Sequence, residues 1–317
     1  MTASDDERYA CVTVDLDTLR CYRDIHGLEH AVVGHQGDPT YTVGLRRILD
    51  FFAEMGIAST LFVIGRDTSV AAHHELLGEA HEAGHELGNH TYSHHYDLRA
   101  RSRSEQQAEL ARGEGAIASV IGEPPVGFRA PGYNIDAGLL ELCRSRRYEY
   151  DSSIFPCPPY YLAKGAIMAW QRLRGRPSRS MQTPFANNFA PTTPYRPDRD
   201  HVWRADPTSE MPLEVPMCLV PGLRLPVIGT SLHLLGTSGF DAVYPLLRRR
   251  YTSILNLEFH AIDFIDETDV SDGERLAEHQ PDLAVPWQEK RRLYTDVLNR
   301  IREDYLFSTL NDAVDHL

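Results

Sequence analysis

Two histidines with ligand-like spacing are the strongest local signal in this sequence of 317 residues. His90 and His94 lie four residues apart in the segment His-Thr-Tyr-Ser-His. On a helical turn this spacing would put both imidazoles on one side, where they could share a cation. Because the chain has 15 histidines, a structural or surface pair is the alternative interpretation. A third ligand is needed to favour a metal site.

A pair of aspartates supplies a candidate for that third ligand. Asp15 and Asp17 stand two residues apart in Thr-Val-Asp-Leu-Asp, on one face of the chain if it stays extended. Two carboxylates at the end of a buried apolar strand are unfavourable unless a cation balances them. A divalent metal or an arginine would do so. The alternative is a strand end that emerges into a solvated turn.

Three further polar residues follow expected strands. Arg129 precedes a Pro-Gly turn in Gly-Phe-Arg-Ala-Pro-Gly-Tyr, and Asp151 lies in Tyr-Asp-Ser-Ser. His260 ends the segment Leu-Asn-Leu-Glu-Phe-His. A single histidine at such a place is usually a core residue, so these positions gain meaning only if the fold brings them together.

Short apolar runs alternate with amphipathic segments, which predicts an α/β fold with parallel strands, as a barrel or an open sheet. In either case the carboxyl ends of the strands form the site. We expect strands at 9–16, 58–64, 127–129, before 151, at 213–215 and at 253–259. We expect helices over 45–52 ended by Gly56, up to about Gly84, from Ser104 with Gln107 in a capping box, over 136–147, and after Trp287 and Ser308.

This rhythm breaks between about residues 155 and 212, a stretch rich in Pro, Arg and Tyr. We interpret it as an insertion within one domain that spans residues 1–317. A helix over 160–179 would carry five cations, with its arginines crowded at the C-terminal end; they are Lys164, Arg172, Arg174, Arg176 and Arg179. This basic patch could bind a phosphate group or contact an anionic membrane surface. The alternative is an ordinary packed helix with a solvated charged end.

Composition excludes several classes of function. A net charge of -13 argues against nucleic acid as a partner, because phosphate contacts need clustered Lys and Arg. The first residues are acidic and polar, unlike a signal peptide, and no run approaches the roughly 20 apolar residues of a membrane span. The five cysteines are scattered. We therefore expect a cytoplasmic protein, and the sequence predicts nothing about its oligomeric state.

In order and spacing these motifs resemble the polysaccharide deacetylase family (carbohydrate esterase family 4, the NodB-homology fold). The family has an Asp-pair strand, His-x-x-x-His, Arg-x-Pro-Gly, an Asp segment and a late Leu/Phe-His strand. The resemblance spans about residues 9–265, interrupted by the insertion. It implies a distorted (β/α)7-type barrel and hydrolysis of an N-acyl group, N-acetyl in the first instance, on an amino sugar.

The resemblance also implies a metal centre and a base. Asp17, His90 and His94 would bind the metal, zinc or another divalent ion such as Co²⁺, Mn²⁺ or Ni²⁺. Asp15 would be the general base that activates water, and Arg129 would pair with it. The common pattern has two adjacent aspartates, whereas Leu16 separates them here. The second carboxylate is therefore assigned to the metal and the first to the base.

The remaining implied roles concern the leaving group and the oxyanion. His260 would be the general acid that protonates the departing amine, and Asp151 would lie near it and raise its pKa. Tyr133 would offer its backbone N–H to the tetrahedral oxyanion. The fourth motif differs from the common Asp-plus-Trp form, since Asp151 is followed by two serines.

Three alternatives remain open. The substrate could be a phosphate-bearing or lipid-linked amino sugar, as the basic patch suggests. The same fold could instead hydrolyse a formamide, a ureide or a cyclic imide, for which a closed pocket would suit better than an open groove. A barrel that binds carbohydrate without catalysis is the third, although no ligand, base or acid is missing from the sequence.

Overall fold

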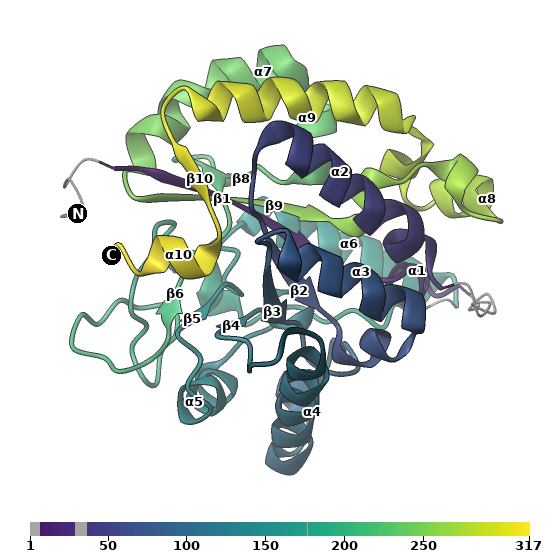
Figure 1. Cartoon of the computed structure of the whole chain (residues 1–317). Coiled ribbons are helices and arrows are strands. Elements are labelled where there is room, and N and C mark those ends of the chain that lie inside the picture. The colour runs from purple at the N-terminus through teal and green to yellow at the C-terminus, as the bar shows by residue number, and fades with distance from the viewer. Residues whose placement is uncertain (1–6, 29–36, 176) are drawn as a thin grey trace.

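The computed structural model describes residues 7–28, 37–175 and 177–317. A curled sheet of parallel strands forms its centre, and helices cover the outside (Figure 1). The order across the sheet is β9, β1, β2, β3, β4, β5, β6, with β10 beside the first residues of β1. The strands are β1 Tyr9–Asp15, β2 Thr60–Val63, β3 Glu86–Asn89, β4 Gly127–Phe128, β5 Tyr150–Asp151, β6 Leu213–Glu214, β9 Ile254–His260 and β10 Leu306–Ser308. This arrangement confirms the distorted (β/α)7-type barrel.

The helices follow the strands in sequence, as parallel connections require. They are α1 Leu19–His26, α2 Arg46–Met55, α3 Ala71–Glu82, α4 Arg103–Ile121, α5 Ala137–Ser145, α6 Pro158–Leu173, α7 Gly229–Arg250, α8 Gly273–Ala277, α9 Trp287–Arg302 and α10 Leu310–Val314. A small antiparallel hairpin, β7 Leu219–Val220 and β8 Leu225–Pro226, lies between β6 and α7. Within the described ranges, no helix combines the length and the apolar composition that crossing a membrane requires.

Alternation along β1 separates the core from the site. Val12 and Val14 pack outward with residues of α2, α7 and α9, in the largest apolar cluster of the molecule. Cys11 belongs instead to a smaller cluster inside the barrel with Phe62 and Tyr150. Since successive side chains of a strand point to opposite faces, the inward series continues to Asp15. The barrel is therefore apolar at one end and carries carboxylates at the other.

The ends of two helices test the local sequence signals, one of which is correct and one of which is wrong. Helix α2 ends at Met55, and Gly56 adopts the left-handed conformation with φ 60°, as expected. The capping box expected at Ser104 is wrong by two residues. Ser102 caps α4, because its hydroxyl accepts the backbone N–H of Glu105 at 3.3 Å and the Glu105 carboxylate accepts the N–H of Ser102 at 3.0 Å.

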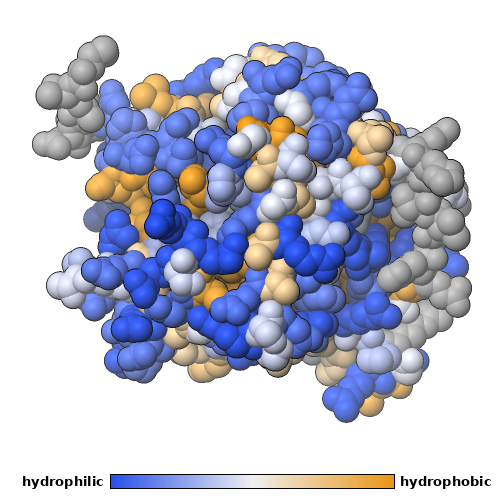
Figure 2. Space-filling view, turned by 60° about the horizontal axis from the view of Figure 1, so that its bottom comes forward, coloured by the Kyte–Doolittle hydropathy of each residue, from blue (hydrophilic) through white to orange (hydrophobic). Residues whose placement is uncertain are grey.

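The stretch 155–212 runs from β5 to β6 and carries α6 as its long helix. The expected helix over 160–179 is shorter and earlier in the structure. It begins at Pro158, where a missing N–H costs no hydrogen bond, and ends at Leu173 before Gly175 with φ 72°. On the face of the molecule seen in Figure 2, hydrophilic side chains predominate and apolar ones lie in small groups.

Candidate active site

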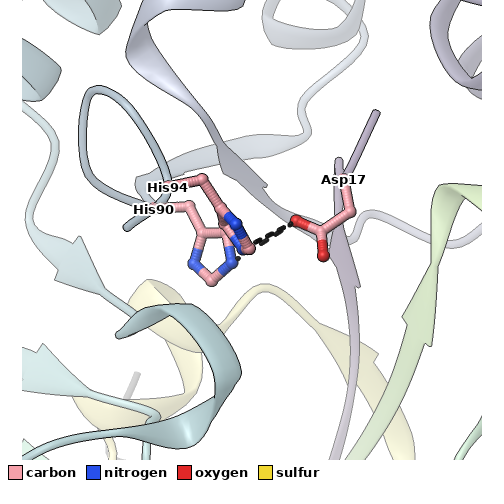
Figure 3. A group of neighbouring side chains, drawn as sticks. All are labelled: Asp17, His90 and His94. Atoms are coloured by element: carbon pink, nitrogen blue, oxygen red, sulfur yellow. Dashed lines mark ion pairs between the residues drawn. The ribbon is translucent and has the colours of Figure 1, made fainter. Parts of the chain in front are cut away.

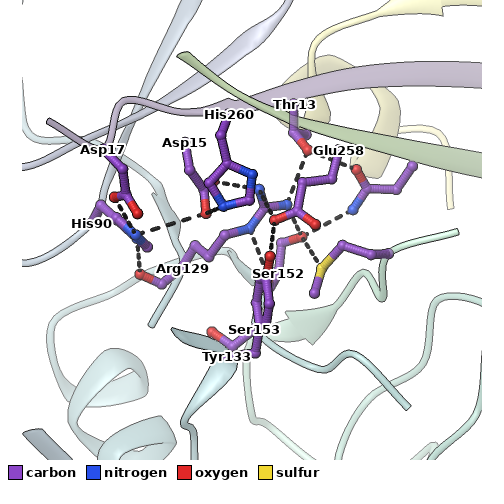
Figure 4. A network of polar contacts seen from close by, with 12 residues as sticks. Thr13, Asp15, Asp17, His90, Arg129, Tyr133, Ser152, Ser153, Glu258 and His260 are labelled. Atoms are coloured by element: carbon purple, nitrogen blue, oxygen red, sulfur yellow. Dashed lines mark hydrogen bonds and ion pairs between the residues drawn. The ribbon is translucent and has the colours of Figure 1, made fainter. Parts of the chain in front are cut away.

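The sheet brings the candidate residues to one end of the barrel. Asp15 is the last residue of β1 and His260 the last of β9, and the two are direct partners in the register of these strands. His90 follows β3, and Arg129 follows β4. Figure 4 shows these side chains converging on one network. Six of the expected site residues come together here, counting Asp17 two positions beyond Asp15 and His94 beside it.

Asp17, His90 and His94 form a cluster that could hold a metal ion (Figure 3). Their potential ligand atoms all lie within 4.8 Å of one another. Oδ1 of Asp17 is 3.1 Å from Nε2 of His94 and 3.6 Å from Nε2 of His90. Oδ1 of Asp17 and both ring nitrogens of His94 are buried without a hydrogen bond of good geometry among the described residues. Buried polar atoms are normally satisfied, so these atoms fit a shared cation.

A backbone contact orients His90. Its Nδ1 lies 2.7 Å from the carbonyl oxygen of Arg129. Because a carbonyl can only accept, Nδ1 carries the proton and Nε2 is left with its lone pair toward the carboxylates. Burial lowers the pKa of His90 to about 4. The ring is therefore neutral near pH 7, which is the state that binds metal.

The carboxylate of Asp17 makes this pocket favourable for positive charge. Burial by itself would raise the pKa of Asp17, but the imidazoles of His94 and His90 bring it below its ordinary value. Burial likewise opposes a charge on His94, yet Asp17 raises the pKa of His94 well above its ordinary value. A proton or a metal ion at this point satisfies the same negative charge.

The two histidines do not lie on a helical turn, so this expectation is wrong. Thr91 and His94 have positive φ angles, 65° and 56°, and the segment between the histidines is a bent loop. The backbone N–H of His94 donates to Oγ1 of Thr91 at 3.1 Å. Left-handed backbone is unfavourable for residues other than glycine and concentrates at functional sites. Here it turns both rings toward Asp17.

Arg129 is fully buried and holds Asp15. Its Nη1 donates to Oδ1 of Asp15 at 2.6 Å, while Nη2 donates to Oγ1 of Thr13 at 3.0 Å and to Oγ of Ser152 at 2.8 Å. Its Nε donates to the carbonyl oxygen of Ser152 at 2.7 Å. The guanidinium also stacks over Phe62, with Cζ 4.2 Å from the ring centroid. The pairing of Arg129 with Asp15 is confirmed.

The second carboxylate oxygen of Asp15 faces two imidazoles. Oδ2 lies 3.7 Å from Nε2 of His90 and 4.0 Å from Nε2 of His260. Asp15 thus stands between the candidate metal ligands on one side and the candidate acid on the other. This position is suited to moving a proton between water and a neighbouring group.

Glu258 is a site residue that the sequence reasoning missed. It is fully buried, its Oε1 lies 3.6 Å from Nη1 of Arg129, and it accepts the phenolic O–H of Tyr133 at 2.8 Å. Burial raises the pKa of Glu258 to about 7. The available signal was its place in Leu-Glu-Phe-His, two residues before His260 and therefore on the same face of a strand.

His260 is tuned by several carboxylates. Burial by itself would lower its pKa, but Glu258, Asp15, Asp17 and Asp263 raise it above the ordinary value. Its backbone N–H donates to Oδ2 of Asp263 at 2.8 Å. A protonated imidazole at neutral pH is what a general acid needs.

Asp151 does not have the role expected beside His260. Its Oδ1 accepts the hydroxyl of Ser153 at 2.5 Å, and it pairs across the sheet with Glu214. Burial raises the pKa of Asp151 to about 6, and burial followed by the charge of Asp151 raises that of Glu214. The carboxylates that act on His260 come from β1 and the residues just after it, from β9, and from the turn after β9. The register of the strands, rather than the order of the motifs, determines which carboxylates lie near His260. We therefore assign to Glu258 the role of raising the pKa of His260.

The backbone N–H of Tyr133 is also not free for an oxyanion in this structure. It donates to the carbonyl oxygen of Ala130 at 3.0 Å, closing a tight turn in which Gly132 and Tyr133 both have φ 61°. The phenol of Tyr133 instead supports Glu258. The structure thus gives Tyr133 a side-chain contact in place of the expected backbone role.

A cavity of about 410 Å³ opens onto these groups. Its wall combines the ends of β1 and β9 with residues of α1, α6, α7 and the loop before α9. This volume lies in the range of small-molecule pockets. Among its lining residues are Asp15, Asp17, His90, Tyr133, Lys164 and His260.

Comparison with known proteins agrees with this geometry. A family model described as polysaccharide deacetylase matches residues 36–150, a range that contains the two histidines and Arg129. A peptidoglycan deacetylase of Helicobacter pylori is 29% identical over 133 residues, which are 41% of this chain and 44% of that protein. A peptidoglycan-N-acetylglucosamine deacetylase of Bacillus cereus is 30% identical over 114 residues, 35% of this chain and 49% of that one. The matches thus span less than half the length of each relative.

The fold is shared over the whole chain. The crystal structure of a candidate polysaccharide deacetylase from Mycobacterium smegmatis superposes with a TM-score of 0.50 and 17% identity, covering 98% of this chain and 96% of that one. Asp15, Asp17 and His260 fall outside the range of the family match, and the barrel places them beside the residues inside it. Residues 36–150 thus resemble the polysaccharide deacetylase family in sequence, and the whole chain shares its fold with that solved structure.

Proposed function

We propose that this protein is a metal-dependent hydrolase that removes an N-acetyl group from an amino sugar. One observation carries the proposal. Asp17 and His94 present unsatisfied buried ligand atoms and cluster with His90. This cluster lies directly beside a carboxylate held by Arg129 and beside a histidine with a raised pKa. A ligand cluster, a base and an acid facing one cavity are the parts that amide hydrolysis requires.

The residues present fit a divalent metal. Two imidazoles and one carboxylate form a donor set typical of catalytic zinc, with room for a further ligand, and we propose Zn²⁺, with Co²⁺, Mn²⁺ and Ni²⁺ as possible substitutes. A divalent ion held there by Asp17, His90 and His94 would polarise the amide carbonyl and lower the pKa of water. The orientation of His90 by the Arg129 carbonyl, at 2.7 Å, prepares one ligand in advance.

Asp15 is the proposed general base. Its carboxylate faces the cavity, and the guanidinium of Arg129 stabilises its negative charge through a 2.6 Å hydrogen bond. As water attacks the carbonyl carbon, Asp15 takes a proton from it. Arg129 in turn is held by Ser152 and Thr13, so the carboxylate keeps one orientation throughout.

His260 is the proposed general acid. Nearby carboxylates raise its pKa, which favours the protonated ring, and its side chain, 22% exposed, lines the cavity. When the C–N bond breaks, His260 gives its proton to the amine nitrogen, and acetate leaves with its oxygen from water. Asp15 and His260 lie 4.0 Å apart, so both can reach opposite sides of one amide group.

The size of the cavity bears on the substrate. About 410 Å³ suits a small amino sugar better than a long polymer in an open groove. The same observation favours a second candidate, hydrolysis of a small formamide, ureide or cyclic imide. We keep the amino sugar first because the matched relatives are named as deacetylases of peptidoglycan and of its N-acetylglucosamine.

Further proposals concern the substrate and the location of the protein. We propose that the substrate carries a phosphate or a lipid. We also propose that residues 160–179 contact an anionic membrane, which is supported by four exposed apolar side chains on α6: Leu162, Ile167, Trp170 and Leu173. Arg176 of this patch lies outside the described residues. We also propose a cytoplasmic location, which the five unpaired cysteines support.

Acetate release tests the proposed function. The purified protein is incubated with N-acetylglucosamine, its oligomers, and matched N-formyl and ureide compounds, and free amine and acid are measured. We expect acetate from an N-acetylated amino sugar, loss of activity on chelation and recovery with Zn²⁺. Release from formamides or ureides alone would favour the second candidate, and activity unaffected by chelation would contradict metal dependence.

A further inference from the structure

Lys164 of α6 is a cation in the wall of the catalytic cavity. Among the described residues it is the only lysine or arginine that lines this cavity. The described arginines of the basic patch do not line the cavity. Arg174 stacks on Trp170 at 4.0 Å, Arg179 pairs with Asp24 at 2.8 Å, and Arg172 is exposed. The described part of the basic patch therefore separates into three solvent-facing arginines and one lysine that lines the cavity.

Contacts place the ammonium of Lys164 near the metal ligands. A Cβ built on Gly132 would lie 3.8 Å from Nζ of Lys164 and 2.9 Å from the ring of Tyr96. The Tyr96 ring packs edge-on against His94, with centroids 4.7 Å apart. Gly132 and Tyr96 thus link Lys164 to the ligand cluster through adjacent contacts. A substrate whose amide lies at the cluster would extend toward this lysine.

Lys164 has no counter-ion among the residues that the structure describes. No carboxylate of the described residues lies within ion-pair distance of its Nζ; its nearest aromatic partners are Tyr160 and Tyr161, each with a ring centroid 6.0 Å away. Burial lowers the pKa of Lys164 to about 8, so the side chain is still mostly charged near pH 7. A half-buried charge without a partner is unfavourable, and a ligand anion would relieve that cost.

The surroundings would strengthen such a contact. Apolar side chains line the same cavity, including Ile25, Ile167 and Ile228. Where water is partly excluded, a charge pair is worth more than at the surface. Lysine is a common phosphate ligand and binds carboxylates equally well as a point charge.

We propose that Lys164 is a specificity residue that binds an anionic group, a carboxylate or a phosphate, on the acylated amine substrate. This inference rests on the proposed function for its reaction, and it adds the charge of the substrate. Lys164, which belongs to the insertion at 155–212, would bind the anionic group, while the residues at the strand ends perform the chemistry. Two of the carboxylates that line the cavity, Asp15 and Asp17, have the proposed roles of base and metal ligand.

Matched substrates and variants test this proposal. The substrates are N-acetylglucosamine, its 1-phosphate and 6-phosphate, and N-acetylmuramic acid, which carries a carboxylate. The variants are Lys164→Met, Lys164→Arg, and Arg172→Met as the control from the same helix. We expect Lys164→Met to lower kcat/KM about 10- to 100-fold on the preferred anionic substrate and less than about threefold on the neutral one.

The variants separate charge from packing. Lys164→Arg should recover much of the activity on the anionic substrate, and Arg172→Met should match the wild type on all four compounds. Preference for a phosphorylated sugar or for N-acetylmuramic acid decides which anion the site receives. An equal loss by Lys164→Met on neutral and anionic substrates, or no loss on either, would overturn the proposal.

A binding measurement keeps this test independent of turnover. Inorganic phosphate and acetate are titrated into the wild type and Lys164→Met by calorimetry. We expect at least one of the two anions to bind about tenfold more weakly to the variant. If the wild type releases acetate from no substrate, the proposed function fails, and calorimetry alone decides on Lys164. Anion binding that is absent or unchanged in the variant would contradict an anion site.

Discussion

Replacing Glu258 by Gln should change how the stability of the protein depends on pH. Glu258 is fully buried between Arg129 and Tyr133. Burial raises its pKa from an ordinary 4.5 to about 7. Gln keeps the carbonyl oxygen that accepts the Tyr133 hydroxyl and removes the charge. The variant therefore isolates the ionisation of one buried group.

The sign and size follow from the pKa. Because the folded protein binds a proton at Glu258 more tightly than the unfolded chain, its stability falls as the pH rises from about 4.5 through about 7. A difference of about 2.5 pH units at about 1.36 kcal/mol per unit corresponds to about 3 kcal/mol. Glu258→Gln removes this loss. Relative to the wild type, the unfolding free energy of the variant should therefore rise by up to about 3 kcal/mol as the pH increases from about 4.5 to about 7.

Urea denaturation followed at several pH values between about 5 and 8 measures this difference. Glu82→Gln, an exposed position on α3, is the matched control and should follow the wild type. In activity assays, Glu258→Gln should also shift the alkaline limb of the rate profile to lower pH, because Glu258 is one of the carboxylates that raise the pKa of His260. A difference in unfolding free energy that stays constant from about pH 5 to 8 would refute the raised pKa of Glu258 in the folded protein.

Two further substitutions test the base and its partner. Asp15→Asn should lower kcat about 10²- to 10⁴-fold and leave the bound metal in place; a variant with more than about a tenth of wild-type kcat would exclude Asp15 as the base. Arg129→Met should cost about 3–5 kcal/mol of unfolding free energy, because it leaves Asp15 and Glu258 buried without their cation. Urea denaturation measures this cost, and a loss under about 1 kcal/mol would contradict the buried ion pair.

The sequence was sufficient to locate residues at the ends of long or strongly apolar strands. Asp15 and His260 close strands of seven residues each, and their apolar runs point to those ends. Gly56 ends α2 as its type predicts. These signals are local, so periodicity and turn residues alone could locate them.

Short strands were beyond such reasoning. β3, Glu86–Asn89, was not expected, since it has four residues and includes a glycine. The structure explains that glycine: a Cβ on Gly88 would lie 2.7 Å from the Phe62 ring of the neighbouring strand. β10 was missed for a similar reason, because only its pairing with β1 defines it. Tertiary contacts, not propensity, form these strands.

Partners across strands were likewise not predictable. Glu258 lies beside Thr13, and Asp151 beside Glu214, because of the register of the sheet. Motif order gives the list of polar residues but not which of them face each other. Asp151 was therefore assigned to His260, although β9 and β1 supply the carboxylates around that ring. The direction of Lys164 depended in the same way on where α6 packs.

Metal content tests the central claim most directly. It is measured by elemental analysis in the wild type, in a His90→Ala, His94→Ala double variant, and in a His74→Ala, His81→Ala control from exposed positions on α3. We predict about one zinc or similar divalent ion per chain in the wild type and the control, and its loss in the double variant while the fold persists. A wild type that binds no divalent ion, or a double variant that keeps it, would contradict a metal centre at Asp17, His90 and His94.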